Sequence, residues 1–185
     1  MFAGTIGVMQ GLDSVLDSAE CLLKGQPRIK FVFVGGGVAH DQLMQTAAER
    51  NLTNVIFLER QPIEAMAAIL ALADVLLVHL KDTPLFRMTI PSKLQAYIAV
   101  GKPILMGVKG DAAKIIQASD AGEVVEPENP VSIAQGVLKL FGLSDTARKR
   151  LGMNAREFYQ KCMSMPSGIQ SLEDIFRRVL NRLQP

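Results

Sequence analysis

Segments of the sequence that combine glycine turns with a basic helix start can hold a phosphate. Gly4-Thr5-Ile6-Gly7 and Gly35-Gly36-Gly37 are glycine turns that follow apolar runs, and Pro91-Ser92-Lys93 opens a helical pattern. Glycine lets a ligand approach the backbone, and the first N–H groups of a helix attract anions. A lysine in the first helical turn is disfavoured by the helix dipole unless an anion lies at the same end. These segments therefore indicate a site for an anionic ligand.

Each of these features also has a purely structural interpretation. Gly36 and Gly37 can serve a tight turn for chain reversal alone, Gly4 and Gly7 can belong to an ordinary loop, and Lys93 can be a surface lysine. Pro91 suits a first helical turn, which Thr89 or Ser92 would cap. If an anion is bound there, Arg87 and Lys81 in the preceding loop supply further positive charge.

Apolar runs alternate with segments of helical periodicity along the chain, and this order predicts which elements position the glycine turns. Strands are expected at 2–4, 29–34, 55–58, 74–79, 104–107 and 122–125, and helices at 10–24, 40–50, 62–73, 91–100, 111–119 and 130–140. A polar loop is expected over 81–90. From about Ser144 the chain is expected to be helical, with a break near Pro166-Ser167-Gly168.

Strands that are apolar throughout and separated by helices favour a parallel sheet covered on both faces. We expect an α/β fold with a doubly wound parallel sheet, Rossmann-like, over residues 1–143, and a C-terminal helical extension of the same domain over 144–185. Ligands of such sheets bind beyond the carboxyl ends of the strands, at the point where the strand order reverses. The segments expected at this edge are Gly4–Gly7, Gly35–Gly37, Glu59-Arg60-Gln61-Pro62, Lys81–Lys93 and Gly107–Gly110.

Composition excludes several classes of protein. The chain has 185 residues, 49% hydrophobic and 21% charged, which excludes a disordered tail, a collagen-like fibre and a disulfide scaffold. A formal charge of +2 is low for a nucleic-acid binder, and an aromatic content of 5% leaves few stacking platforms for bases or glycans. The length suits one domain.

The sequence also predicts a compartment. Cys21 and Cys162 have no CxxC partner and are expected to be reduced, buried thiols of a cytoplasmic protein. The first residues show no basic segment followed by an apolar stretch, as a signal peptide requires. The most apolar stretch, 65–80, is interrupted by Asp74 and His79 and is shorter than the roughly 20 residues that span a bilayer.

Several catalytic motifs are missing from the sequence. There is no GxSxG elbow, no GxxxxGK[ST] loop and no evident carboxylate pair, and no metal site is expected because His40 and His79 lack ligand spacing and suit capping or core roles. A nicotinamide site stays open as an alternative, with Glu59 near the ribose, although His40 replaces the last glycine of GxGxxG. The basic runs 148–150 and 177–178 are expected to be solvated helix faces or contacts to an anionic membrane.

Taken in order, these motifs resemble the nucleotide-sugar-binding C-terminal domain of family 4 retaining glycosyltransferases, which have the GT-B fold. The residues that carry the resemblance are Gly4-Thr5-Ile6-Gly7 with Gln10-Gly11-Leu12, Phe33 to Gly37, Asn54 to Phe57, Ala73-Asp74-Val75, Pro91-Ser92-Lys93 and Ala99 to Pro103. The resemblance covers nearly the whole chain. Its nearest branch is the one that builds bacterial O-antigen and capsule, including transferases of N-acetylfucosamine type.

The chain departs from the family pattern at positions that usually contact the donor. Thr5 and Gln10 stand where the family often has Arg and Lys. Met88 and Ala96 stand where two acidic residues, eight positions apart, usually contact the donor sugar and ribose. Gln95 is a neutral hydrogen-bonding substitute. These departures put the identity of the donor, and activity itself, in question.

The resemblance implies transfer of a sugar, with retention, from a nucleoside diphosphate donor, UDP-linked, to a glycan or lipid-linked acceptor. It implies Gly7, Ser92 and Lys93 at the phosphates with Arg87 near them, Arg60 and the backbone of Glu59 at the base, and Gln95 near the ribose. No catalytic residue is assigned, and no cofactor other than the donor substrate is expected.

The resemblance also implies a missing N-terminal acceptor domain, since a GT-B enzyme binds its donor between two such domains. The strand expected at residue 1 would then be the cut edge of a larger enzyme, and this fragment alone would show no turnover. Any peripheral contact with the membrane would be made through the full-length enzyme. The alternatives are a non-catalytic nucleotide- or partner-binding module, an NAD-type domain, and half of a nucleotide-sugar epimerase that shares the GT-B fold.

Overall fold

The computed structural model describes residues 1–183, and its core is a parallel sheet. The strands are β1 (Phe2–Ala3), β2 (Phe31–Val34), β3 (Val55–Leu58), β4 (Leu76–His79), β5 (Ile104–Gly107) and β6 (Gly122–Val124). They form two three-stranded parallel sheets, β1-β2-β3 and β4-β5-β6. The Met1 nitrogen donates to the Val75 carbonyl at 2.7 Å and the Leu77 N–H donates to the Met1 carbonyl at 2.8 Å. These bonds join the sheets in the order β3-β2-β1-β4-β5-β6.

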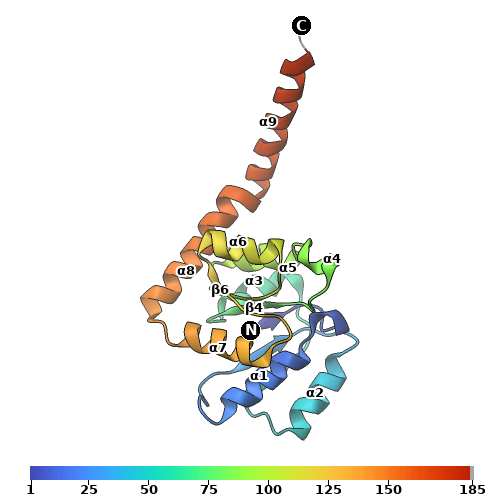
Figure 1. Ribbon diagram of the computed structural model, residues 1–185, viewed down its shortest axis with the longest axis vertical. Coiled ribbons are helices and arrows are strands. Elements are labelled where there is room, and N and C mark those ends of the chain that lie inside the picture. The colour runs from blue at the N-terminus through green and yellow to red at the C-terminus, as the bar shows by residue number, and fades with distance from the viewer. Residues whose placement is uncertain (184–185) are drawn as a thin grey trace.

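Helices cover both faces of the joined sheets, as Figure 1 shows. They are α1 (Asp13–Leu23), α2 (His40–Glu49), α3 (Ile63–Ala71), α4 (Pro84–Arg87), α5 (Ser92–Val100), α6 (Asp111–Ser119), α7 (Pro130–Phe141), α8 (Asp145–Phe158) and α9 (Met165–Leu183), with a 3-10 turn, η1 (Val8–Gln10), and a π-helical segment, η2 (Tyr159–Met163). The doubly wound α/β fold expected from the alternating pattern is therefore confirmed.

Alternation along the strands divides the core into two clusters. Leu77 and Leu105 point to the face covered by α1, α2 and α7, while their neighbours Leu76, Val78 and Ile104 point to the face covered by α3, α5 and α6. Successive strand residues point to opposite faces, so a strand that is apolar at every position fills both clusters. This burial on both sides explains why these strands read as unbroken apolar runs.

The two C-terminal helices, α8 and α9, differ in their contact with the core. Ala155 of α8 is fully buried in the cluster beneath α5 and α6, so α8 packs on the body of the domain. In Figure 1, α9 projects away from that body. The helical chain breaks at Ser164, close to the expected Pro166-Ser167-Gly168. Pro166 lies in the first turn of α9, where its missing N–H costs no hydrogen bond, and Gly168 lies inside that helix.

Several local expectations are wrong for reasons that lie in the tertiary contacts. Cys21 and Cys162 are exposed, not buried. Arg148 is not a solvated basic residue, because its guanidinium donates to the carbonyls of Phe141 at 3.2 Å and Leu143 at 2.9 Å and so closes the end of α7. The expected loop over 81–90 contains the short helix α4. Within residues 1–183, no helix is both long and apolar enough to cross a membrane.

Candidate functional site

The strand order reverses between β1 and β4, and a buried tyrosine separates the carboxyl ends of these two strands. Tyr97 of α5 is 1% exposed, and its hydroxyl accepts from the Ala3 N–H at 2.7 Å and donates to the Ala3 carbonyl at 2.9 Å. The hydroxyl thus takes the hydrogen bonds of Ala3 that a neighbouring strand would otherwise take. The edge where ligands of doubly wound sheets bind therefore lies beside Ala3 and the loops that follow β1 and β4.

The two glycine turns pack against each other at this edge. The Gly4 N–H donates to the Val34 carbonyl at 2.9 Å, and the Ile6 N–H donates to the Gly36 carbonyl at 3.0 Å. Gly35 has φ +134° and Gly37 has φ +154°, and a Cβ on either would overlap a backbone carbonyl of the first turn. Packing of the two turns thus accounts for these two glycines. Gly36 has open space where its Cβ would be, so its backbone is accessible to a ligand.

Gly7 and Thr5 differ in what they present to this edge. The Gly7 N–H already donates to Gln10 Oε1 at 2.9 Å, in a reciprocal cap at the start of η1. Thr5 is exposed, as is Gly4. The glycine loop after β1 therefore offers the backbone of Thr5 more directly than the N–H groups of Gly4 and Gly7, which already donate to Val34 and Gln10.

Lys93 lies beside the first glycine turn. Its Nζ lies 3.5 Å from the centroid of the Phe2 ring and 3.3 Å from the place that a Cβ on Gly4 would occupy. This Nζ is buried and has no hydrogen-bond partner among the described residues. Burial lowers the pKa of Lys93 to about 7, because desolvation penalises the charged form. An anion at this edge would supply the partner that the ammonium lacks.

The start of α5 is not capped by a side chain. Pro91 occupies the cap position without a side-chain hydrogen bond, and Ser92 is exposed at the first helical position. The expected cap from Thr89 or Ser92 is wrong, because the Thr89 hydroxyl donates to the Leu85 carbonyl at 2.7 Å, at the end of α4. The first N–H groups of α5 thus lie next to Lys93 and can donate to an anion.

Arg87 is held in an ion-pair network on the same side of the sheet. Its guanidinium donates to both carboxylate oxygens of Asp82, at 2.7 and 2.9 Å, and Lys109 lies 3.0 Å from Asp82 and pairs with Glu126. Hydrogen bonds from Arg87 and Lys109 lower the pKa of Asp82 to about 2. Asp82 thus already neutralises Arg87, which makes it a weaker phosphate contact than its charge suggested.

Other predicted contacts are not brought to the glycine turns. Glu59 and Arg60 are exposed at the end of β3, two strands away from β1. The Gln95 amide donates to the Met163 carbonyl at 2.8 Å, next to the C-terminal helices. Residues two apart on a helix point in nearly opposite directions, which explains why Gln95 diverges from Lys93.

His79 has the structural role expected of it. It is fully buried at the end of β4, where its Nδ1 donates to the Gln10 carbonyl at 2.7 Å and its Nε2 accepts from the Glu128 N–H at 3.1 Å. This arrangement requires the neutral ring, and burial lowers the pKa of His79 accordingly. Across the part of the chain that the structure describes, no group of three His, Cys, Asp or Glu side chains could hold a metal ion.

Comparison with known proteins decides the family. The family described as "Glycosyl transferases group 1" matches residues 1–158. The chain belongs to this family. It is 30% identical over 140 residues to the putative colanic acid biosynthesis glycosyl transferase WcaI of Escherichia coli, covering 74% of this chain and 34% of that protein. The chain thus spans about a third of the length of this curated relative.

Solved structures share the fold. The C-terminal domain of the group 1 glycosyl transferase LpcC from Francisella tularensis superposes with a TM-score of 0.73 at 17% identity, covering 89% of this chain and 86% of that one. HepE from Anabaena, solved in complex with UDP, superposes with a TM-score of 0.78 at 16% identity, covering 96% of this chain and 48% of that one. The chain therefore has the fold of GT-B glycosyltransferase C-terminal domains.

The position of the glycines disfavours the nicotinamide alternative. In a dinucleotide-binding fold the glycine-rich turn follows the first strand, at the switch point. Here Gly35–Gly37 follows β2, and Glu59 follows the edge strand β3 rather than a neighbour of β1. Sequence order alone did not reveal this, because it does not say which strands are adjacent.

Proposed function

We propose that the chain is the donor-binding domain of a transferase that moves a sugar, with retention, from a UDP-linked donor to a glycan or lipid-linked acceptor. The observation that carries the proposal is the buried Lys93 Nζ, which lies beside Gly4 at the open start of α5 and has no hydrogen-bond partner within residues 1–183. The UDP complex of HepE supports a uridine nucleotide, since that protein shares this fold. A polysaccharide product is in keeping with the name of the relative WcaI.

In this proposal the site stabilises the diphosphate as it departs from the sugar. Negative charge grows on that group as the bond to the sugar breaks. Preorganised N–H groups at Ser92 and Lys93, with the Lys93 ammonium whose Nζ is buried, stabilise such charge. In this proposal Gly4 and Gly36 let the diphosphate approach the backbone, because neither position carries a side chain.

The remaining predicted donor contacts either have to leave their present partners or lie farther from the glycine turns. Gly7 would have to release Gln10, Arg87 would have to share Asp82, and Gln95 would have to leave the Met163 carbonyl. Arg60 and the backbone of Glu59 keep their proposed place at the base, since the end of β3 is exposed. We therefore rank Lys93 and Ser92 above these residues as donor contacts.

The acceptor site belongs, in this proposal, to an N-terminal domain that this fragment lacks. Residues 1–185 alone are then expected to bind donor without turnover. The apolar face of α9 is one surface for that domain, because Ile169, Leu172, Phe176 and Val179 are exposed at helical spacing. Membership of the N-acetylfucosamine branch, a cytoplasmic location and contact of the full-length enzyme with the membrane stay predictions.

Calorimetric titration with UDP, a UDP-sugar and NAD tests the proposal. We expect UDP and the UDP-sugar to bind and NAD to fail. Lys93→Met should weaken UDP binding at least tenfold, whereas Lys114→Met should leave it unchanged, because Lys114 is an exposed lysine that pairs with Asp111 on α6. Equal affinity of Lys93→Met and the unaltered chain for UDP would contradict the phosphate assignment.

A non-catalytic nucleotide-binding module is the second candidate, and one observation favours it. Met88 and Ala96, at the positions where the family usually has carboxylates, are exposed and apolar. A module that recognises only the nucleotide would bind UDP and UDP-sugars equally, while a donor site should prefer the sugar-bearing form.

A further inference from the structure

A hollow of about 470 Å³ lies at the amino edge of the sheet, between the carboxyl end of α5 and one side of α8. The charged side chains that line it are Lys102, Arg148, Lys149, Arg156, Asp74 and Asp145. Helix α5 begins with Ser92 and Lys93 at the carboxyl edge and ends with Val100 at this hollow. The hollow is therefore separate from the candidate donor site, at the other end of the same helix.

A close contact between two glycines holds the walls of this hollow together. A Cβ on Gly152 of α8 would lie 2.2 Å from the Gly101 carbonyl oxygen, so only glycine lets α8 pack on the turn that ends α5. The same Cβ would lie 3.5 Å from the Lys102 Cα, and a Cβ on Gly101 would lie 3.4 Å from the Arg156 Cβ. Lys102 and Arg156, which are far apart in the sequence, are thus held beside one rigid contact.

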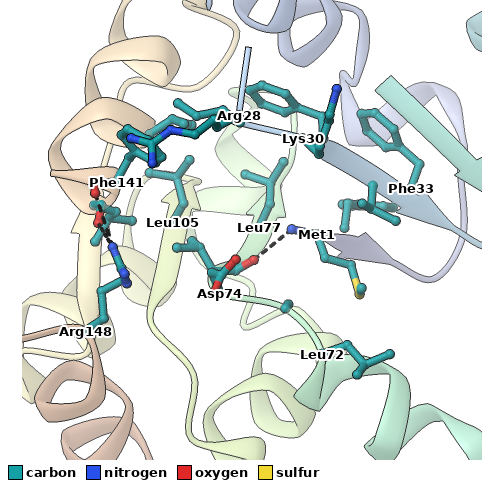
Figure 2. Close-up of a pocket in the computed structure, with 18 residues that line it drawn as sticks. Met1, Arg28, Lys30, Phe33, Leu72, Asp74, Leu77, Leu105, Phe141 and Arg148 are labelled. Atoms are coloured by element: carbon teal, nitrogen blue, oxygen red, sulfur yellow. Dashed lines mark hydrogen bonds between the residues drawn. The ribbon is translucent and has the colours of Figure 1, made fainter. Parts of the chain in front are cut away.

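Two of the charged groups in this hollow pair with each other. The Arg148 guanidinium donates to the Asp145 carboxylate and to the carbonyls of Phe141 and Leu143. Figure 2 draws a neighbouring apolar cavity that shares Asp74 and Arg148 with the hollow, and it shows this guanidinium directed at the end of α7. The charge balance of the hollow therefore depends on its other four charged groups.

Those four groups leave an excess of positive charge. Lys102, Lys149 and Arg156 form no ion pair with a carboxylate within residues 1–183, and Asp74 is the remaining acidic group of the lining. The carboxyl end of α5 adds only about half a negative charge. Cations that gather without sufficient counter-charge repel one another, so a bound anion would stabilise the arrangement.

We propose that this hollow binds a phosphate group, either of a soluble phosphate compound or of an anionic lipid headgroup. A phosphate group carries up to two negative charges near neutral pH, which matches the excess better than a carboxylate does. Lys102 and Lys149 supply point charges, and the planar guanidinium of Arg156 can donate two parallel hydrogen bonds to phosphate oxygens. The basic run 148–150 thus contributes Lys149 to a site whose other cations come from distant segments. The inference does not depend on what binds beside Lys93.

The first test is a titration of the isotope-labelled chain with inorganic pyrophosphate, followed by nuclear magnetic resonance. The amides of Gly101 and Gly152 report on the hollow, whereas the amide of Gly36 reports on the candidate donor site. We expect saturable shifts at Gly101 and Gly152. Lys102→Met and Lys149→Met should each weaken this binding by roughly threefold or more, as for one partly exposed charge contact. Lys24→Met is the matched control and should bind like the unaltered chain, because Lys24 is an exposed lysine at the end of α1.

Sedimentation with phosphatidylglycerol vesicles, compared with phosphatidylcholine vesicles, separates the two sources of the phosphate. Sedimentation that Lys102→Met and Lys149→Met reduce assigns the group to a lipid headgroup, while pyrophosphate binding without sedimentation assigns it to a soluble ligand. Equal pyrophosphate affinity of these two variants and Lys24→Met would overturn the proposal. So would the lack of shifts at Gly101 and Gly152 if vesicle binding is absent, or is the same in all three variants.

Discussion

The Lys93 Nζ lies 3.5 Å from the centroid of the Phe2 ring, which joins the first turn of α5 to β1 across the switch point. The ring face attracts the cation but cannot replace the hydrogen bonds that an ammonium makes in water. Burial therefore lowers the pKa of Lys93 to about 7, so that the charged and neutral forms are about equally populated near neutral pH. A bound anion would shift this balance toward the charged form.

Binding of UDP should weaken as pH rises through 7. Lys93 has a pKa of about 7, so its side chain is mostly protonated at pH 6 and mostly neutral at pH 8.5. The free chain therefore offers less positive charge to UDP at the higher pH. Calorimetry at these two values measures the change. Lys93→Met should flatten the profile, whereas an unchanged pH dependence in this variant would assign it to another group.

The stability of the chain without ligand should change in the opposite direction. Lys93 has a lower pKa in the folded chain than the ordinary 10.5, so the unfolded chain binds more protons between pH 7 and 10.5. The contribution of Lys93 to the free energy of unfolding should thus rise with pH across this window. Urea unfolding at pH 7 and pH 9.5 tests it, with Lys93→Met showing the smaller rise.

Tyr97→Phe should destabilise the domain by about 1–3 kcal/mol, because it leaves the N–H and the carbonyl of Ala3 buried and unpaired. Tyr159→Phe is the matched control, since Tyr159 is only half-buried in η2. Urea unfolding measures both variants. Equal losses in the two would show that the hydroxyl of Tyr97 has no special role at the switch point.

Gly35→Ala should destabilise the chain by more than about 2 kcal/mol, while Gly36→Ala should be tolerated. At Gly35 the φ of +134° is strained for alanine, and the added Cβ would overlap the Gly4 carbonyl. At Gly36 the Cβ would meet nothing within 4 Å. If Gly36→Ala nevertheless weakens UDP binding, its backbone approaches the ligand; comparable thermal stability of both variants would refute the packing argument.

Acid should destabilise the chain through His79. Its pKa is lowered from 6.5 by burial, so the unfolded state binds more protons as pH falls below 6.5, and stability falls with it. His79→Gln keeps hydrogen-bonding capacity without this titration and should reduce the loss between pH 7 and pH 5. His40→Gln is the control, because the His40 ring bonds to the exposed carboxylate of the neighbouring Asp41. An identical acid response in both variants would exclude His79.

Sequence patterns predicted the elements better than the contacts between them. The expected strands at 55–58 and 104–107 and the helix at 111–119 agree with β3, β5 and α6, because apolar runs and glycine boundaries are local signals. Arg148 is the counterexample. Its basic run indicated a solvated face, yet the end of α7 folds back within its reach. No local pattern marks that return.

In the candidate site, too, the sequence predicted the local segments but not the contacts between them. The order of the glycine turns and the Pro91-Ser92-Lys93 helix start can be read from the sequence, and so can the α/β fold and the family. These features depend on residues that are close together in the chain, which set the backbone conformation and the apolar pattern of each strand. Only the tertiary structure decided that Lys93 lies on Phe2 while Gln95 binds Met163 and Arg87 binds Asp82. These pairings join residues from different elements, and the direction of each side chain is set by the packing of whole helices on the sheet.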